Sequence, residues 1–311
     1  MSTGIVRAAT LYVNCGAKAG LNSIGAALKA LQYSDDRGPA TINVAGACKE
    51  NLLIQNVDRL TLNALQGASI TDASGGLKDL IDVNNSNSFT LRGFTLTGGV
   101  DTVSCYYQSH CLLVQNTISG GTGNAIAVYP TSTAFVVGGV VQNSGFNGLL
   151  VRGDVIAAGV LAQNNGTNGA AVQEGGRLLF RPSDPAFDGV TVSTPAVIQN
   201  NQFNGIRAVR GATLVCRGCV INGNTQEGVH LELTATASFE AYFFTNSSTE
   251  TTISGNGGSG VNVRDLSNAA FFNATSVTGN AQPDITCNTP TSVTANALGA
   301  AGGSAHTNCT N

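Results

Sequence analysis

The chain has 311 residues, and 11% of them are charged, where an ordinary globular domain carries about 25%. Its 39 glycines, 7 prolines and lack of tryptophan favour short strands and tight turns over long helices. The net charge of −3 and the scattered Lys and Arg argue against nucleic acid as a partner, and no run of 18 apolar residues predicts a membrane span.

The N-terminus and the cysteines bear on the cellular compartment. Residues 1–4 lack the basic and apolar segments of a secretory leader, so the protein is either cytosolic or exported with its leader absent from this chain. The eight cysteines favour export, because they fall into four local pairs that can form disulfides. The pairs are Cys15 with Cys48, Cys105 with Cys111, Cys216 with Cys219, and Cys287 with Cys309. We therefore expect a secreted, periplasmic or cell-surface protein. For Cys216 and Cys219, two reduced core thiols remain the alternative, and no second ligand pair supports zinc.

The first predicted element is a helix over residues 21–31. Leu21, Ile24, Leu28 and Leu31 recur at helical spacing and form one apolar face. Short β-rich runs follow at residues 41–44, 53–54 and 60–62, and the helix is expected to cap the first of them.

A repeat organises the rest of the chain. The pattern is an apolar residue, an asparagine three positions later, a glycine four positions after that, and then a second apolar residue; its clearest copies start at Ile198, Ile221 and Ile253, and Val277 begins one with Asp284 in place of the glycine. Successive copies of the second apolar residue are 21 to 24 residues apart, apart from two longer steps of 36 and 32. This period predicts a parallel β-solenoid of about ten turns with an internal asparagine ladder and glycine at the corners. The nine second apolar residues are Ile81, Val103, Ile126, Leu149, Ala170, Ile206, Val229, Val261 and Ile285.

Strand alternation then predicts which side chains point away from the core. The first outward column is Asp82, Ser104, Ala127, Leu150, Ala171, Arg207, His230, Asn262 and Thr286. The second is Asn84, Tyr106, Tyr129, Arg152, Gln173, Val209, Glu232, Arg264 and Asn288, and Tyr107, Glu174, Arg210 and Asp265 lie just beyond it. One face thus gathers much of the charge of a charge-poor chain. The two long steps predict insertions at about 181–188 and 235–250, which we expect to form walls beside this face.

The order of elements resembles the right-handed parallel β-helix superfamily of pectate lyases, polygalacturonases and alginate epimerases. The likeness lies in the capping helix followed by Thr41-Ile42-Asn43-Val44, Leu53-Ile54 and Leu60-Thr61-Leu62, and it covers residues 11–290. It implies an all-β, single-domain right-handed parallel β-helix: a cap helix and connection at 11–40, coils at 41–290, and a C-terminal cap or tail at 291–311. The catalytic signatures of those families are missing; the DPHE-like motif of alginate epimerases, for example, has only Asp184-Pro185 here, followed by Ala186.

Two functions remain open. In the first, the protein acts on or binds an acidic polysaccharide, with lyase or epimerase chemistry first and glycoside hydrolysis second. The catalytic candidates are Arg207, His230, Glu232 and Arg264, and the substrate-binding candidates are Tyr106, Tyr129, Arg152, Glu174, Arg210, Asn262 and Asp265. No cofactor is expected, and calcium is left open without a recognisable site. In the second, the protein is a non-catalytic surface, adhesive or filament-forming solenoid that self-associates, and the outward charges and tyrosines only stabilise the sheet.

Overall fold

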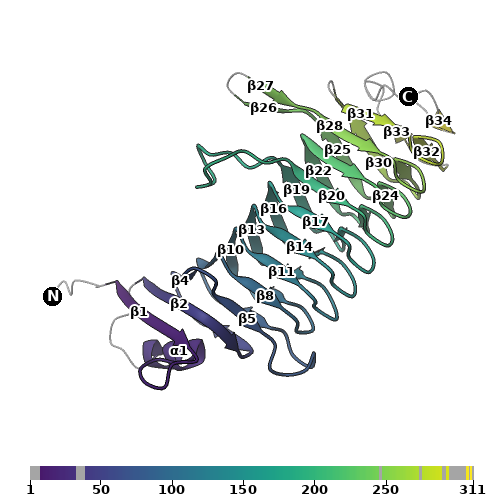
Figure 1. Ribbon diagram of the computed structural model, residues 1–311. Helices are drawn as coiled ribbons and strands as arrows, with labels where there is room; N and C mark the ends of the chain where they lie inside the picture. The colour runs from purple at the N-terminus through teal and green to yellow at the C-terminus, as the bar shows by residue number, and fades with distance from the viewer. Residues whose placement is uncertain are drawn as a thin grey trace, which may run out of the picture.

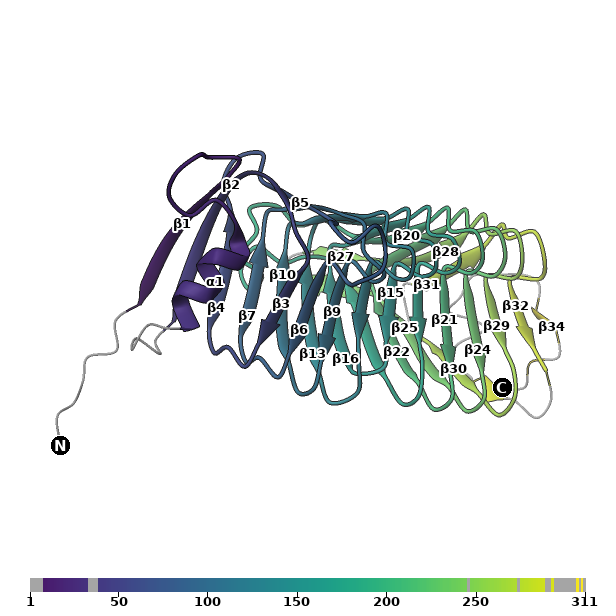
Figure 2. The same cartoon turned by 90° about the horizontal axis from the view of Figure 1, so that it is seen from below.

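The protein is a right-handed parallel β-helix in which each turn contributes strands to three sheets (Figures 1 and 2). The computed structural model describes residues 8–32, 39–244, 247–272, 275–288, 292–293, 306–307 and 309. We name the sheets A, B and C in the order in which a turn passes through them. This architecture confirms the fold class and the approximate number of turns predicted from the repeat.

Within the described residues, sheet A contains β1 (Ala9–Cys15), β2 (Ala40–Lys49), β4 (Leu60–Ala64), β7 (Phe89–Arg92), β10 (His110–Val114), β13 (Thr133–Val137), β16 (Asp154–Ala158), β19 (Arg177–Arg181), β22 (Thr213–Arg217), β25 (Thr236–Glu240), β30 (Asn268–Phe271) and β33 (Ser292–Val293). Sheet B contains the end of β2, then β5 (Ser69–Thr71), β8 (Thr95–Thr97), β11 (Thr117–Ser119), β14 (Val140–Gln142), β17 (Leu161–Gln163), β20 (Ala196–Gln199), β23 (Cys219–Asn222), β28 (Thr251–Ser254) and β31 (Thr275–Thr278).

Sheet C carries the outward columns. It contains β3 (Leu52–Gln55), β6 (Ile81–Asn84), β9 (Val103–Tyr106), β12 (Ile126–Val128), β15 (Leu149–Val151), β18 (Ala170–Val172), β21 (Ile206–Val209), β24 (Val229–Glu232), β29 (Val261–Val263), β32 (Ile285–Cys287) and β34 (His306–Thr307). The nine apolar residues of the repeat are direct register partners in this sheet, and each is completely buried. The predicted register is therefore confirmed residue by residue.

The helix α1 (Ile24–Gln32) covers the N-terminal end of the core, as predicted. Ile24 and Ala27 are completely buried. The first backbone N–H groups of the helix donate to Ser23 Oγ and to both carboxylate oxygens of Glu50, at 2.8 to 3.1 Å, which satisfies groups that a helix N-terminus leaves unpaired. The strand β1 lies before the helix and pairs with β2, so the sheet begins earlier than the predicted residue 41. All four predicted disulfides are present.

The predicted asparagine ladder runs inside the corner between sheets B and C. The Nδ2 group of each asparagine donates to Oδ1 of the asparagine one turn further on, at 2.8 to 2.9 Å, and Asn280 donates to Asp284 at 3.0 Å. Ser144 begins the series by donating to the first asparagine at 2.7 Å. The members in order are Ser144, Asn165, Asn201, Asn224, Asn256, Asn280 and Asp284.

Glycine is expected at this corner because its backbone adopts conformations that other residues resist, but the structure gives a different reason. The recurrent glycine does not adopt a positive φ; a Cβ atom at Gly205 would lie 2.6 Å from the Gly228 carbonyl oxygen and 2.8 Å from Asn224 Nδ2. Close approach of the next turn, rather than an unusual backbone conformation, therefore excludes a side chain at this position.

The two insertions lie between sheets A and B. Residues 182–195 connect β19 to β20, and the antiparallel hairpin of β26 (Tyr242–Phe244) and β27 (Ser247–Thr249) connects β25 to β28 (Figure 1). The expectation that they border the charged face of sheet C is wrong, because the length of a step does not reveal which of its three corners has expanded.

Candidate functional site

Charged side chains from three turns of sheet C line a hollow of about 530 Å³ beside the corner between sheets B and C. One wall comes from corner residues that precede the recurrent glycine, and the floor comes from outward side chains of sheet C. We call this the corner hollow. It is lined by Phe146, Asn147, Thr167, Asn168, Gln173, Phe203, Asn204, Arg207, Gln226, Glu227, His230, Glu232 and Arg264.

All four predicted catalytic residues line the corner hollow. Arg207 and His230 are register partners on β21 and β24, so their side chains project from neighbouring strands. The Arg207 guanidinium forms an ion pair with Glu232, whose other carboxylate oxygen lies 3.3 Å from His230 Nε2. Arg264 comes from the next turn, directly after β29. The sequence-derived column thus brings three turns of the solenoid to one place.

Glu227 is a site residue that the sequence analysis missed. Its Oε1 lies 3.9 Å from His230 Nδ1 and accepts a hydrogen bond of 3.2 Å from Asn262 Nδ2. The imidazole ring of His230 is therefore flanked by two carboxylates, Glu227 and Glu232. Its side chain is only 11% exposed. The available signal was position: Glu227 directly precedes the recurrent glycine, where the three preceding turns have asparagine.

Both carboxylates are held in the ionised form. Contact with His230 lowers the pKa of Glu227 to about 2, although burial opposes this change. Burial also works against ionisation of Glu232, but hydrogen bonds and charge from Arg207 and His230 outweigh it and lower its pKa. The two carboxylates balance the positive charges of Arg207 and Arg264. Of these two cations, Arg264 is the one without a carboxylate within ion-pair distance among the described residues.

Several polar atoms of this site lack hydrogen-bond partners. His230 Nδ1, Asn262 Oδ1 and Arg264 Nε are all buried from solvent, and none makes a hydrogen bond to another described residue. Such unpaired buried groups are rare in folded proteins, since each costs about 1–3 kcal/mol. The described residues contain six such atoms, and three of them lie in this site.

The tyrosines lie on earlier turns and do not reach the corner hollow. Tyr106 and Tyr129 stack with ring centroids 4.0 Å apart, and Tyr129 packs on Leu150 and its neighbours in a small apolar cluster outside the main core. Burial raises the pKa of both phenols. Tyr129 donates a hydrogen bond of 3.3 Å to Asp101, and burial raises the pKa of that carboxyl as well.

Three of the remaining candidates, Arg152, Glu174 and Arg210, form a partly exposed charge ladder. Glu174 lies 3.6 Å from Arg152 and 3.8 Å from Arg210, and its side chain is 45% exposed. Asp265 is in neither this ladder nor the lining of the corner hollow. Val209, expected to point outward, is buried at 2% exposure. The ion pairs of Glu174 with Arg152 and Arg210 are what the stabilising interpretation of the outward charges predicts, and the binding role of these residues stays a prediction.

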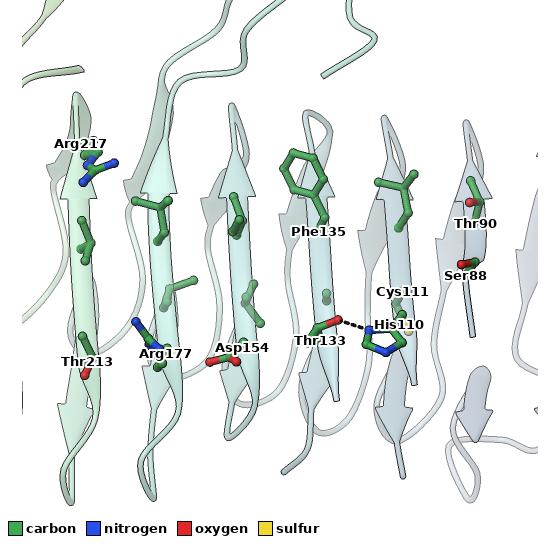
Figure 3. Close-up of a pocket in the computed structure, with 17 residues that line it drawn as sticks. Ser88, Thr90, His110, Cys111, Thr133, Phe135, Asp154, Arg177, Thr213 and Arg217 are labelled. Carbon is green, nitrogen blue, oxygen red and sulfur yellow. Dashed lines mark hydrogen bonds between the residues drawn. The ribbon is translucent and has the colours of Figure 1, made fainter. Parts of the chain in front are cut away.

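A second groove, of about 690 Å³, runs along the outer face of sheet A (Figure 3). Its floor is apolar, with one side chain per turn: Leu112, Phe135, Ile156, Leu179 and Val215. Figure 3 shows His110, Thr133, Asp154, Arg177 and Thr213 in a row along one side, and His110 bonds to Thr133 at 2.7 Å. The guanidinium of Arg181, the last residue of β19, lies 5.6 Å over the Phe135 ring. The groove's ionisable side chains, His110, Asp154, Arg177 and Arg217, form no ion pair or hydrogen bond with one another.

Two further observations concern metals and membranes. Within the described residues, the one group of three His, Cys, Asp or Glu side chains with ligand atoms within 4.8 Å is Cys15, Cys48 and Glu50, and its two sulfurs are joined in a disulfide. No helix in the described ranges is both long enough and apolar enough to cross a membrane.

No protein-family model matches the chain, and no curated protein matches it. Among solved structures, the chain is similar to the A-module of the mannuronan C-5 epimerase AlgE4 from Azotobacter vinelandii. The TM-score is 0.64 at 15% identity, over 90% of this chain and 86% of that chain. The likeness is one of fold. It confirms the predicted resemblance to parallel β-helix proteins.

Proposed function

We propose that the protein binds an acidic, uronate-containing polysaccharide in the corner hollow and removes the C5 proton of a uronate ring. The observation that carries this proposal is His230, a base flanked by Glu227 and Glu232 and accompanied by Arg264 and its unpaired Nε. The uronate class is also suggested by the name of the structurally similar protein, a mannuronan C-5 epimerase. Four disulfides support a location outside the cytoplasm.

The chemistry requires a cation and a base. Removing the proton from C5 places negative charge on the neighbouring carboxylate, and Arg264 stabilises it because no protein carboxylate within the described residues neutralises this guanidinium. His230 accepts the proton as general base, and Glu227 and Glu232 hold the ring and interact favourably with its protonated form. Arg207 keeps Glu232 in place through their ion pair.

The lining favours elimination over epimerisation. In elimination, the C5–H electron pair forms the C4–C5 double bond, the C4–O4 bond breaks, and the protonated His230 returns its proton to O4. Epimerisation instead needs a second acid to deliver a proton to the opposite face of C5. No tyrosine, lysine or cysteine lines the corner hollow among the described residues, whereas elimination uses His230 twice.

The test follows both outcomes in one experiment. Polymannuronate, polyguluronate and polygalacturonate are incubated with the protein in D₂O, with and without calcium, and analysed by NMR for deuterium at C5 and by ultraviolet absorbance for unsaturated uronate. We expect new absorbance with at least one polymer, and a loss of about 10²- to 10⁴-fold in His230→Gln. His110→Gln, on the second groove, is the matched control. The catalytic proposal is refuted if no polymer incorporates deuterium at C5 and no polymer gives new absorbance.

The second candidate is a non-catalytic surface or adhesive solenoid. It is favoured by the low charged fraction of 11% and by the missing signatures of the enzyme families. It predicts polysaccharide binding without turnover, or self-association that sedimentation velocity would detect at rising protein concentration.

A further inference from the structure

Two exposed phenylalanines stand on the corner wall of the hollow. Phe146 lies between β14 and β15, Phe203 lies between β20 and β21, and they are 57% and 47% exposed. Other large apolar side chains are also exposed, Phe187 at 82% among them, but Phe146 and Phe203 are the two apolar side chains in the lining of the corner hollow. Exposing half of an aromatic ring forgoes part of the free energy of burial, and here it places two apolar surfaces inside an otherwise polar hollow.

The architecture does not require phenylalanine at either position. Backbone hydrogen bonds join Phe146, Thr167, Phe203, Gln226 and Gly258 into one column, with one residue per turn. Because threonine, glutamine and glycine occupy the same position on other turns, the corner tolerates small and polar residues. Neither Phe146 nor Phe203 belongs to a hydrophobic cluster or stacks on another ring within the described residues.

The spacing of the two rings suits a polymer. They are two turns apart, which is about 10 Å at the usual strand separation. Phe203 belongs to the turn of Arg207, and His230 is on the next turn, so the column leads from the reaction centre toward the N-terminal end of the solenoid. The side chains between and beside the rings, Thr167, Asn168 and Asn204, are uncharged.

We propose that Phe146 and Phe203 are stacking platforms for two pyranose rings of a polysaccharide that lies along the solenoid axis, with its reacting residue at His230. This inference rests on the proposed function and specifies the substrate further. Aromatic faces bind the C–H face of a sugar ring irrespective of its carboxylate. The two phenylalanines therefore bind sugar rings with or without a carboxylate, and the carboxylate of the substrate is recognised at Arg264. The substrate is a chain of at least four sugars on this side, with a uronate required at the reacting position.

The platforms are tested by binding, independently of turnover. Phe146→Thr and Phe203→Thr install the residue that Thr167 already provides in the same column, and Phe187→Thr, at a phenylalanine that is 82% exposed in the 182–195 insertion, is the matched control. Dissociation constants are measured by calorimetry in the His230→Gln background, so that substrate is not consumed. The ligands are the turned-over polymer and its oligomers of two to six sugars.

We expect each platform variant to raise Kd for the polymer by about three- to tenfold, and the double variant by roughly the product. Disaccharide affinity should not change in Phe146→Thr, because that ring is three turns from His230. Unchanged polymer affinity in the double variant, where the His230→Gln parent binds normally, would overturn the platforms and leave the proposed function intact. If wild-type protein binds none of the polymers, both proposals fail.

Discussion

The ionisation of Glu227 links the candidate site to the free energy of unfolding at low pH. Its pKa of about 2 lies below the ordinary value of 4.5, and the difference corresponds to about 3 kcal/mol in favour of the folded state. Because the pKa is lowered in the folded state, this stabilisation is complete above pH 4.5 and is lost as the pH falls toward 2. At pH 3, about 2 kcal/mol of it should already be gone. Glutamine keeps the shape of the side chain but cannot ionise, so Glu227→Gln should lack this pH dependence.

The assay is urea unfolding of wild type and Glu227→Gln at pH 6, 4 and 3. We expect the difference between their free energies of unfolding to shrink by about 2 kcal/mol from pH 6 to pH 3. The control is Glu174→Gln, at an exposed ion pair whose removal should change stability by no more than about 1 kcal/mol at each pH. Equal losses of stability in wild type and Glu227→Gln between pH 6 and pH 3 would refute the reasoning.

Two other predictions concern stability. Burial and the charge of Asp79 raise the pKa of Asp82 to about 6. The stability that protonated Asp82 gives the folded state is therefore complete below pH 3.8 and is lost as the pH rises through 6. Urea midpoints should show Asp82→Asn to be more stable than wild type by about 1–3 kcal/mol at pH 8 and to gain little at pH 4. A wild type whose stability stays constant over that range would contradict this. Asn224→Ala removes the acceptor for the backbone N–H and Nδ2 groups of Asn201 and should lower the free energy of unfolding by about 2–4 kcal/mol. The control Asn63→Ala removes a hydrogen bond to Asn43 at the surface and should lower it by less than about 1 kcal/mol. Similar thermal midpoints for the two variants would argue against the ladder as a stabilising element.

Much of the fold and part of the site could be predicted because a solenoid repeats one register. Once the apolar residue after the corner glycine is aligned, strand alternation fixes the outward neighbours on every turn, and this is why Arg207, His230 and Asn262 were placed in one column. The cysteine pairs followed from short separations along the chain. A side chain that points away from the core is not always exposed to solvent. Ala127 and Ala171 point outward and are buried beneath their neighbours.

The remainder of the site depended on the shape of the corner. Glu227, Phe146 and Phe203 precede the recurrent glycine, and nothing in the strand period tells whether a corner side chain leans over the sheet or into solvent. The position of the insertions was missed for a related reason. The extra residues of a long repeat can lie at any of the three corners of a turn, and the length of the repeat does not say which. Tyr106 and Tyr129 were grouped with the charges because they share a column, but a column runs the length of the solenoid, whereas a site occupies a few turns.

The asparagine ladder has a direction, and its last member gives it an end. Every amide donates toward the C-terminus, so the dipoles add and the hydrogen-donating end of the series faces Asp284, which occupies the corner position where the five preceding turns have glycine. A carboxylate accepts hydrogen bonds and, when ionised, has none to donate to a following turn. Asp284 therefore acts as a terminator. Lengthening this solenoid by copying a turn should succeed upstream of Asp284 and fail downstream of it, and a designed extension would have to restore glycine at position 284 first.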